Sequence, residues 1–406
     1  MSAETLAWAV RGEPGLSWFE GGGRAVVAWC PDEVATDRVE WTSAARRLQS
    51  RGGLVGGFVG YGAAPKAPCG VAPEGDVWWA HYPGFVSFDR RGAASIVGPP
   101  PFRRTAAAAL RDIRRAPPPD RPTPTPVRGS TSPVAWAGQV AAIREAIAAG
   151  TVYQVNLSHV LRTVSPANPL DAYRLWRRVV RPRHGALVRP QDDVWVLSAS
   201  PEVLLEVDGG RAWSTPIKGT VRRGDGREAD RTARSALEAS EKDRAELAMI
   251  VDLVRNDLTR ISEPPSVRAG RRTLRAHGRV WQASTRVSGM LRPGVDAWDA
   301  LEALFPAGSI TGAPKSTALD VIAGLETSPR GISYGSVGFV TGDRAHFNVA
   351  IRTAVVSPSG MATHVGGGIT WASDAESEWQ ETLAKAAPWL ALFAANHPIH
   401  GTDGQH

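Results

Sequence analysis

The clearest helical pattern in the chain follows residue 132. Ser132 and Pro133 are typical of a helix start, and Gly150 is typical of a helix end. Apolar side chains between them recur at offsets of four, seven and eleven, at Trp136, Val140, Ile143 and Ile147. This spacing predicts an amphipathic helix that begins at residue 133. A second helix is predicted over 105–115, which reads TAAAALRDIRR.

Several segments instead have the pattern of β-strands. Apolar and polar residues alternate over 153–162, which reads YQVNLSHVLR. Further strands are predicted at 193–199, 202–207, 335–342, 348–356 and 363–370. Strands and helices are mixed without regular βα alternation, so we predict an α+β fold rather than a Rossmann-like sheet.

Residues 240–257 predict a helix with an acidic first turn. Ser240 and Asp243 form a capping pattern, and Asp243 and Glu246 are three residues apart on one helix face. An apolar stripe on the same segment, made of Leu247, Ile250, Val251, Val254 and Leu258, is expected to bury the helix.

Residues 373–386 repeat this arrangement. Ser373 or Asp374 is the expected cap, and Glu378 and Glu381 are again three residues apart in the first turns. Each pair alone is explained by helix electrostatics, because acids favour helix N-termini and Glu381 can pair with Lys385. Two such pairs together would suit a shared Mg²⁺ ion, which prefers carboxylate and water oxygens.

Three other features fit an anionic ligand. VGGGIT at 365–370 is either a tight turn or a nest of backbone N–H groups between a strand and a helix. Arg352 is predicted inside an apolar strand, where its charge needs a carboxylate from a side chain or a ligand. A loop of small residues at 305–315 ends in Lys315.

Lys218 lies in the segment TPIKGTVRRG at 215–224, where an apolar strand enters a glycine turn. Three interpretations are open from the local sequence: a solvated surface charge, a phosphate clamp or a nucleophile.

Composition divides the chain and narrows its class. Residues 116–133 are rich in proline and predict a linker or loop between an N-terminal part, 1–115, and a main domain, 134–392, with a polar tail at 393–406. The two cysteines, Cys30 and Cys69, disfavour a secreted disulfide framework. The N-terminus lacks the pattern of a signal peptide and no long apolar run is present, so a cytoplasmic protein without membrane contact is expected.

The net charge of +7 is compatible with nucleic acid, a membrane surface or a small anion. The arginines are dispersed along the chain and no nucleic-acid-reading module is recognisable, so a nucleic-acid partner is not expected.

Taken together and in order, the motifs resemble those of the chorismate-utilising enzymes. The matching segments are YQVNLS, SPE, PIKGT, EKDRAELAMIVDLVRNDL, PAGSITGAPK, AIRT and GGGITWASDAESEWQET, spread over about 134–392. The resemblance implies an anthranilate synthase component I-like fold, with a large interleaved two-sheet β core flanked by helices. It also implies that Mg²⁺ grips the ring carboxylate of the substrate, chorismate.

The resemblance assigns roles to individual residues. Glu246 and Glu381 would ligate Mg²⁺ directly, with Asp243 and Glu378 in support. The remaining substrate contacts would come from Gln154, Ser309, Arg352, Gly367 and Gly368, with Arg352 and the two glycine amides on the enolpyruvyl carboxylate.

Two positions separate branches of the family. Isochorismate-forming members carry a lysine that activates water at the position of Gln154, and glutamine cannot deprotonate water. Anthranilate-forming members typically read PIAGT, whereas members that form aminodeoxychorismate typically read PIKGT, as this chain does at Lys218. The resemblance therefore implies amination of chorismate at C4, toward 4-aminobenzoate and folate, with anthranilate formation at C2 as the alternative.

A mechanism is implied by the same resemblance. Lys218, with its pKa lowered by burial, would add to C2 while Glu202 protonates the departing C4 hydroxyl, and Thr220 would help to position the ring. Ammonia would then displace the lysine. No segment resembles a glutamine amidotransferase, so a separate glutaminase subunit is the implied partner.

Overall fold

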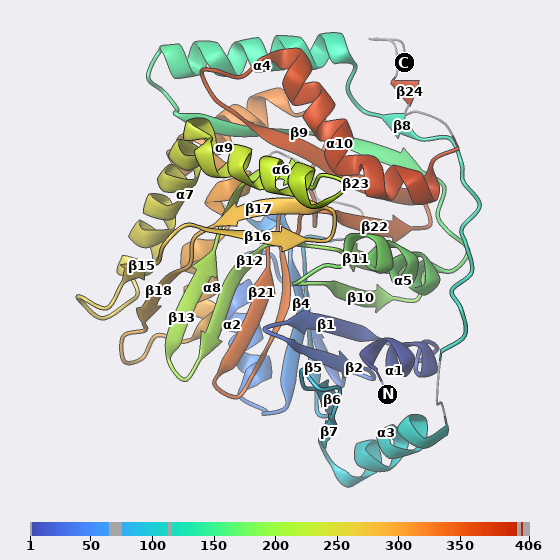
Figure 1. Ribbon diagram of the computed structural model, residues 1–406. Helices are drawn as coiled ribbons and strands as arrows, with labels where there is room; N and C mark the ends of the chain where they lie inside the picture. Colours follow the sequence, from blue (N-terminus) through green and yellow to red (C-terminus); the bar gives the residue numbers. More distant parts are fainter. Residues whose placement is uncertain (1, 65–74, 113–115, 396–398, 401–406) are drawn as a thin grey trace.

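Two large β-sheets form the centre of the protein and helices cover their outer faces (Figure 1). The structure is a computed structural model that describes residues 2–64, 75–112, 116–395 and 399–400. This architecture confirms the predicted α+β fold with an interleaved two-sheet core. No helix in the described part of the chain is long and apolar enough to cross a bilayer.

The first sheet has twelve strands and contains both N-terminal and C-terminal segments. Its order is β24 (Ile399–His400), β8 (Arg128–Gly129), β9 (Gln154–Thr163), β23 (Gly360–Ile369), β22 (Thr353–Ser357), β11 (Val194–Ser198), β10 (Ala186–Gln191), β1 (Ser17–Gly21), β2 (Arg24–Ala28), β6 (Phe85–Phe88) and β7 (Ala94–Val97), and β19 (Gly312–Ala313) pairs with β9. The longest pairing joins β23 to β9 in antiparallel register from Met361 opposite Thr163 to Ile369 opposite Val155.

The second sheet has nine strands. Its order is β15 (Arg268–Ala269), β18 (Val287–Met290), β13 (Arg211–Thr215), β12 (Val203–Asp208), β21 (Arg344–Asn348), β20 (Ser336–Thr341), β4 (Leu54–Val59), β5 (Val77–Tyr82) and β3 (Glu33–Ala35). A separate small sheet has the order β14 (Ile217–Arg222), β17 (Val280–Ser284) and β16 (Thr273–His277).

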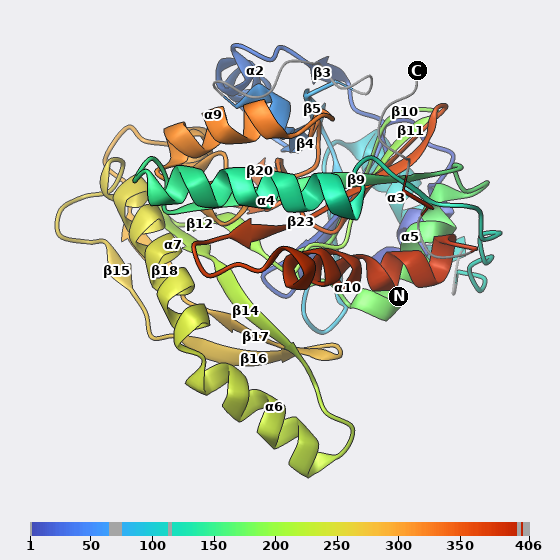
Figure 2. The ribbon, with the colours of Figure 1, turned by 90° about the horizontal axis from the view of Figure 1, so that it is seen from above.

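The helices lie around these sheets. They are α1 (Ala3–Ala9), α2 (Trp41–Gln49), α3 (Pro100–Asp112), α4 (Pro133–Ala148), α5 (Pro169–Val180), α6 (Arg227–Ala239), α7 (Glu241–Thr259), α8 (Ala297–Leu304), α9 (Lys315–Leu325) and α10 (Ala375–Phe393), with short 3₁₀ turns η1 (Tyr61–Ala63) and η2 (Gly308–Ile310). Figure 2 shows α4 and α10 side by side over β23, while α6 and the small sheet project from the body.

Buried apolar residues fill the space between the sheets and beneath the helices. One cluster joins Phe19 and Val188 of the twelve-stranded sheet to Phe58 and Trp78 of the nine-stranded sheet. Other clusters pack α2, α7 and α8 on the nine-stranded sheet, and α1, α5 and α10 on the twelve-stranded sheet. Burial of this apolar surface is the main stabilising contribution to the fold.

The helix predicted after residue 132 is confirmed as α4, whose N-cap Ser132 accepts a hydrogen bond from the backbone of Ala135. The helix predicted over 105–115 corresponds to α3, which begins earlier and covers 100–112. Residues 113–115 lie outside the described part of the chain. The N-terminal strands β1 and β4 pair with β10 and β20, which come from the main domain. The domain boundaries at 115, 133 and 392 stay predictions.

The prediction that Arg352 lies inside a strand is wrong. The strand predicted over 348–356 is two strands, because β21 ends at Asn348 in one sheet and β22 begins at Thr353 in the other. The chain must change sheets between them, and Arg352 adopts the left-handed region at φ 48° in this crossing.

The strand predicted at 363–370 is confirmed as part of β23, whereas the other interpretation of 365–370, a glycine turn or nest, is wrong. Gly366, Gly367 and Gly368 are part of β23 and lie opposite Ser158, Leu157 and Asn156 of β9. A Cβ at Gly366 would be 2.2 Å from the carbonyl oxygen of Leu157, so a close approach of backbones explains that glycine.

A buried ion pair holds the surroundings of η2 and β9 together. Arg330 pairs with Glu326 at 2.7 Å, and their side chains are 0% and 2% exposed. Arg330 also donates to the carbonyl oxygens of Ile310 and Asn156.

Loss of one partner from this pair is expected to be costly. The substitution Glu326→Ala should lower the free energy of unfolding by ~3–5 kcal/mol, because the buried Arg330 charge is left uncompensated. Urea denaturation is the measurement, and Glu302→Ala, at an exposed position of α8, is the control. Equal losses in the two variants would contradict the importance of the pair.

Candidate active site

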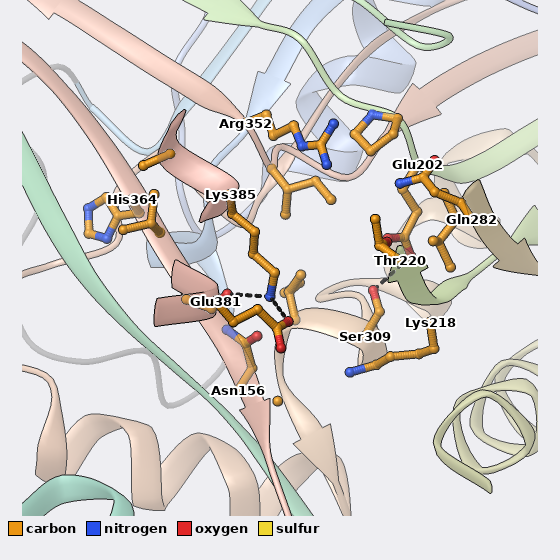
Figure 3. Close-up of a pocket in the computed structure, with 18 of the residues that line it drawn as sticks. Asn156, Glu202, Lys218, Thr220, Gln282, Ser309, Arg352, His364, Glu381 and Lys385 are labelled. Atoms are coloured by element: carbon orange, nitrogen blue, oxygen red, sulfur yellow. Dashed lines mark hydrogen bonds and ion pairs between the residues drawn. The ribbon is translucent and has the colours of Figure 1, made fainter. Parts of the chain in front are cut away.

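A cavity lies where α7, α10, β14 and β23 face two of the segments that cross between the large sheets, namely those that join β11 to β12 and β21 to β22 (Figure 3). Ten of the twelve residues predicted for the site line it, namely Glu202, Lys218, Thr220, Asp243, Glu246, Ser309, Arg352, Gly368, Glu378 and Glu381. Gln154 and Gly367 are not among the lining residues but border them. A Cβ at Gly367 would lie 3.1 Å from a carboxylate oxygen of Glu378.

Glu202 lies in the segment that crosses from β11 of one large sheet to β12 of the other, and it is 4% exposed. The hydroxyl of Ser309 in η2 donates to its Oε1 at 2.8 Å. Burial raises the pKa of Glu202 to about 7, although the Ser309 hydrogen bond and the Lys218 charge act in the opposite direction. A carboxyl group with this pKa can donate a proton near neutral pH.

Lys218 extends from β14 into the cavity, and its side chain is 11% exposed. Burial lowers its pKa, and the Lys385 charge also lowers it, against the opposing charges of Glu246, Glu202 and Glu381. Its Nζ is 4.0 Å from Glu246 Oε2. The interpretation as a solvated surface charge is therefore wrong, because the side chain is enclosed among ionisable groups.

Gly368 leaves room for Lys218 and Gln154. A Cβ at this position would be 2.8 Å from Lys218 Nζ and 2.7 Å from Gln154 Nε2. Both amide atoms of Gln154 are buried and lack a hydrogen-bond partner within the described protein. A buried amide without a partner is costly, so this group is available to a ligand.

The two acidic pairs enter the cavity from the first turns of α7 and α10. The Ser240 hydroxyl accepts from the Asp243 backbone at the start of α7, and Asp374 accepts from Ser377 at the start of α10. Ser373 donates to Glu378 Oε1 at 2.7 Å. The caps thus orient the helices so that both pairs face one cavity, as a shared cation site requires.

Lysines contact these carboxylates. Lys242 Nζ is 4.0 Å from Glu246 and 3.8 Å from Glu378, and so bridges α7 and α10. Lys385 pairs with Glu381 at 2.7 Å, which confirms the expected pair within one helix. Burial by itself would raise the pKa of Glu381, but Lys385 and Lys242 outweigh burial and lower it.

The donor set fits Mg²⁺ by its chemistry. All four groups are carboxylates, and burial raises the pKa of Glu246, which shows that this charge is incompletely compensated. Among the described residues, no three of the four bring ligand atoms within 4.8 Å of one another. An ion held by these groups would therefore need water or ligand oxygens to complete its coordination.

Arg352 is available to a ligand carboxylate. Its side chain is partly buried and has no ion pair or side-chain hydrogen bond among the described residues. Burial lowers its pKa, as expected for a guanidinium that lacks a counter-charge. Within the described residues, no protein carboxylate lies within 4.0 Å of the Arg352 guanidinium, so a carboxylate of a ligand is the remaining candidate partner for its charge.

Several lining residues were not predicted for the site. They are Asn156, Lys242, Gln282, Tyr334, His364 and Lys385. Tyr334 lies in the segment RGISYG at 330–335, is 5% exposed and has φ 63°. Lys242 precedes Glu246 by four residues, a spacing that sequence alone cannot distinguish from a solvated helix pair.

The protein has an α+β fold with a charged cavity, and comparison with known proteins identifies its family. The family model described as chorismate binding enzyme matches residues 14–391. The chain therefore belongs to the chorismate-binding enzyme family.

Curated relatives carry two different names. Anthranilate synthase component 1 of Aquifex aeolicus is 39% identical over 245 residues, which cover 60% of this chain and 49% of that protein. Aminodeoxychorismate synthase of Streptomyces pristinaespiralis is 38% identical over 257 residues, covering 63% of this chain and 36% of that protein. The chain thus spans about half or less of the length of these relatives.

Solved structures share the fold. Anthranilate synthase component I from Streptococcus pneumoniae TIGR4 has a TM-score of 0.79 and 25% identity, covering 89% of this chain and 91% of that chain. The isochorismate synthase MenF from Escherichia coli has a TM-score of 0.79 at 19% identity, covering 95% of this chain and 90% of that chain.

The space at Gly368 provides a test of the cavity. The substitution Gly368→Ala should reduce the turnover of chorismate in the reaction proposed below by about tenfold or more, because the new methyl group displaces Lys218 and Gln154, and small misplacements of site residues are costly. Turnover is followed by loss of chorismate, and circular dichroism confirms folding. The control is Gly138→Ala in α4, where a Cβ meets nothing within 4 Å. Full activity of Gly368→Ala would show that this cavity is not the site.

Proposed function

We propose that the protein catalyses Mg²⁺-dependent amination of chorismate at C4, giving 4-amino-4-deoxychorismate for 4-aminobenzoate and folate synthesis. The enclosed Lys218 is the observation that carries this proposal, because burial lowers the pKa of its amine and so favours the neutral, nucleophilic form. Membership of the chorismate-binding family supports the substrate.

The cavity can divide the two carboxylates of chorismate between different partners. Arg352 would hold the enolpyruvyl carboxylate, helped by the β23 backbone at Gly367 and Gly368. Glu246 and Glu381, supported by Asp243 and Glu378, would hold Mg²⁺. When bound, this ion would neutralise the ring carboxylate and orient it.

The first covalent step uses Lys218 and Glu202. Lys218 in its neutral form adds to C2, the ring double bonds shift, and the C4–O bond breaks. Glu202 gives its proton to the departing hydroxyl, which leaves as water. Thr220 lies two residues after Lys218 on β14 and would help to position the ring.

Ammonia completes the exchange. Its nitrogen attacks C4, the double bonds shift back, the C2–N bond breaks, and Lys218 leaves as the amine after proton transfer. The sum is chorismate plus ammonia giving 4-amino-4-deoxychorismate plus water. Gln154 cannot deprotonate water, so addition of water at C2 is disfavoured.

Ammonia requires a source, and we propose a separate glutaminase subunit as the partner. Relatives named component 1 support a protein that works with a second component. A cytoplasmic location would suit this chemistry.

The second candidate function is amination at C2 with loss of pyruvate to form anthranilate. The curated relatives named anthranilate synthase component 1 favour it. Incubation with chorismate, Mg²⁺ and ammonium, followed by mass spectrometry, separates the two reactions. Anthranilate as the direct product would reject amination at C4.

Removal of the lysine tests the covalent step. The variant Lys218→Ala should lose at least about 100-fold of its amination rate, because the nucleophile is missing. Wild-type protein that is denatured during turnover should carry a covalent adduct on the peptide containing Lys218. Lys315→Ala is the lysine control, since Lys315 pairs with Asp257 and is not among the cavity-lining residues. Wild-type activity in Lys218→Ala would exclude the covalent route.

The pKa of Glu202 predicts a pH dependence. The rate should fall as pH rises through about 7, because the acid that protonates the leaving hydroxyl becomes ionised. The Ser309 hydrogen bond lowers this pKa, so Ser309→Ala should move the fall to higher pH, and Glu202→Gln should abolish it with a large loss of rate. A pH–rate profile that is unchanged in both variants would exclude Glu202 as the acid.

A further inference from the structure

Two histidines and a glutamate meet away from the active-site cavity, between the two large sheets. Glu206 in β12 and His346 in β21 are directly opposite each other on neighbouring strands of the nine-stranded sheet. His184 precedes β10 of the twelve-stranded sheet. The ring of His184 nevertheless reaches the ring of His346, so side chains from both large sheets meet here. None of the three lines the active-site cavity.

The two imidazoles have the spacing of metal ligands. His184 Nδ1 is 3.3 Å from His346 Nε2, and the ring centroids are 5.1 Å apart with nearly parallel planes, at 21°. Nitrogens at ~2.0–2.1 Å from a tetrahedral Zn²⁺ lie about 3.3–3.4 Å apart, with both rings directed at the ion. A separation of 3.3 Å is long for a direct N–H···N hydrogen bond.

Glu206 supplies a third donor. One ligand atom from each of the three residues lies within 4.8 Å of the others. Glu206 Oε1 is also 3.7 Å from His346 Nδ1, the ring nitrogen that does not face His184, so the carboxylate must turn from that nitrogen to share an ion with His346 Nε2. The charge of Arg286 acts on Glu206, but no arginine or lysine pairs with this carboxylate within 4.0 Å in the described chain. Its side chain is 15% exposed, so a small rotation can direct an oxygen to a shared ion without a large solvation change.

The site is prepared for an ion in two further respects. Burial lowers the pKa of His346 to about 4 and that of His184 well below its ordinary value, and nearby Arg183 contributes to the latter. Both rings are therefore neutral at pH 7, the form that binds metals. At Gly21, the end of β1, a Cβ would be 2.0 Å from His346, so this glycine makes the space that the ring occupies.

We propose that His184, His346 and Glu206 form a second metal site, for a transition metal ion of the Zn²⁺ type, that ties the two sheets together. Two imidazoles and one carboxylate are a donor set that Zn²⁺ accepts, with water in the fourth position. This set differs from the four carboxylates of the cavity, which suit a harder ion. The inference is independent of the reaction catalysed.

Metal binding to the stripped full-length protein tests the proposal. Calorimetric titration should show one Zn²⁺ bound per chain at this site, with an increase in the unfolding temperature. The substitutions His184→Gln, His346→Gln and Glu206→Gln should each weaken Zn²⁺ binding by about tenfold or more. His277→Gln, at a buried histidine outside the cluster, and Glu381→Gln, in the cavity, are matched controls that should retain this binding.

Two outcomes would overturn the site. One is unchanged Zn²⁺ affinity in both His346→Gln and Glu206→Gln. The other needs no variant and so does not depend on their folding: wild-type protein with Co²⁺ should develop the intense visible absorption of a tetrahedral ion, and a spectrum identical to aqueous Co²⁺ would exclude the proposed coordination.

Discussion

Two adjacent crossings between the large sheets determine where the chemistry can occur. β11 leads into β12, and β21 leads into β22, so the chain passes from one large sheet to the other in both places. The two crossings are neighbours, because β11 pairs with β22 and β12 pairs with β21. The two crossings are joined by backbone hydrogen bonds, from Val349 N–H to the Glu202 carbonyl and from Ala199 N–H to the Arg352 carbonyl. Glu202 and Arg352, which both line the cavity, are thereby fixed relative to each other through the backbone. Their separation in sequence is bridged by strand pairing rather than by any local motif.

The charges of the cavity depend on one another because they share a partly desolvated space. Four carboxylates on α7 and α10 face three ammonium groups, and Arg352 adds a further cation. Burial lowers the pKa of Lys218 despite the nearby carboxylates. A divalent cation would compensate the acids that Lys242 and Lys385 now contact, and a dianionic ligand would compensate Arg352. Cation and substrate are therefore expected to bind cooperatively.

Local patterns predicted the helices and strands better than they predicted where the chain changes direction. Ser132 and Ser240 are caps as expected, because capping depends on a few neighbouring residues. The continuous apolar run around Arg352 looked like one strand, since nothing local distinguishes one strand from two that belong to different sheets. The turn interpretation of Gly366 failed for a similar reason, because its partner in β9, Ser158, is far away in the chain.

Local sequence patterns were also insufficient to predict which side chains meet in the active-site cavity and in the proposed second metal site. Spacing on a helix predicted that Asp243 and Glu246 share a face, and family motifs supplied their role, but only the fold shows Lys242 between α7 and α10. His184, Glu206 and His346 belong to no motif and could not be found without the sheets.

The proposed second metal site and the active site share two strands. β12 begins directly after Glu202 and carries Glu206, while β21 carries His346 and ends where the crossing to Arg352 begins. An ion held by Glu206 and His346 would oppose sliding of β12 against β21 at one end of their pairing. Because backbone bonds join the crossings at the other end, the relative position of Glu202 and Arg352 depends on this register. A structural ion there would preserve the relative position of Glu202 and Arg352 without lying in the cavity that they line.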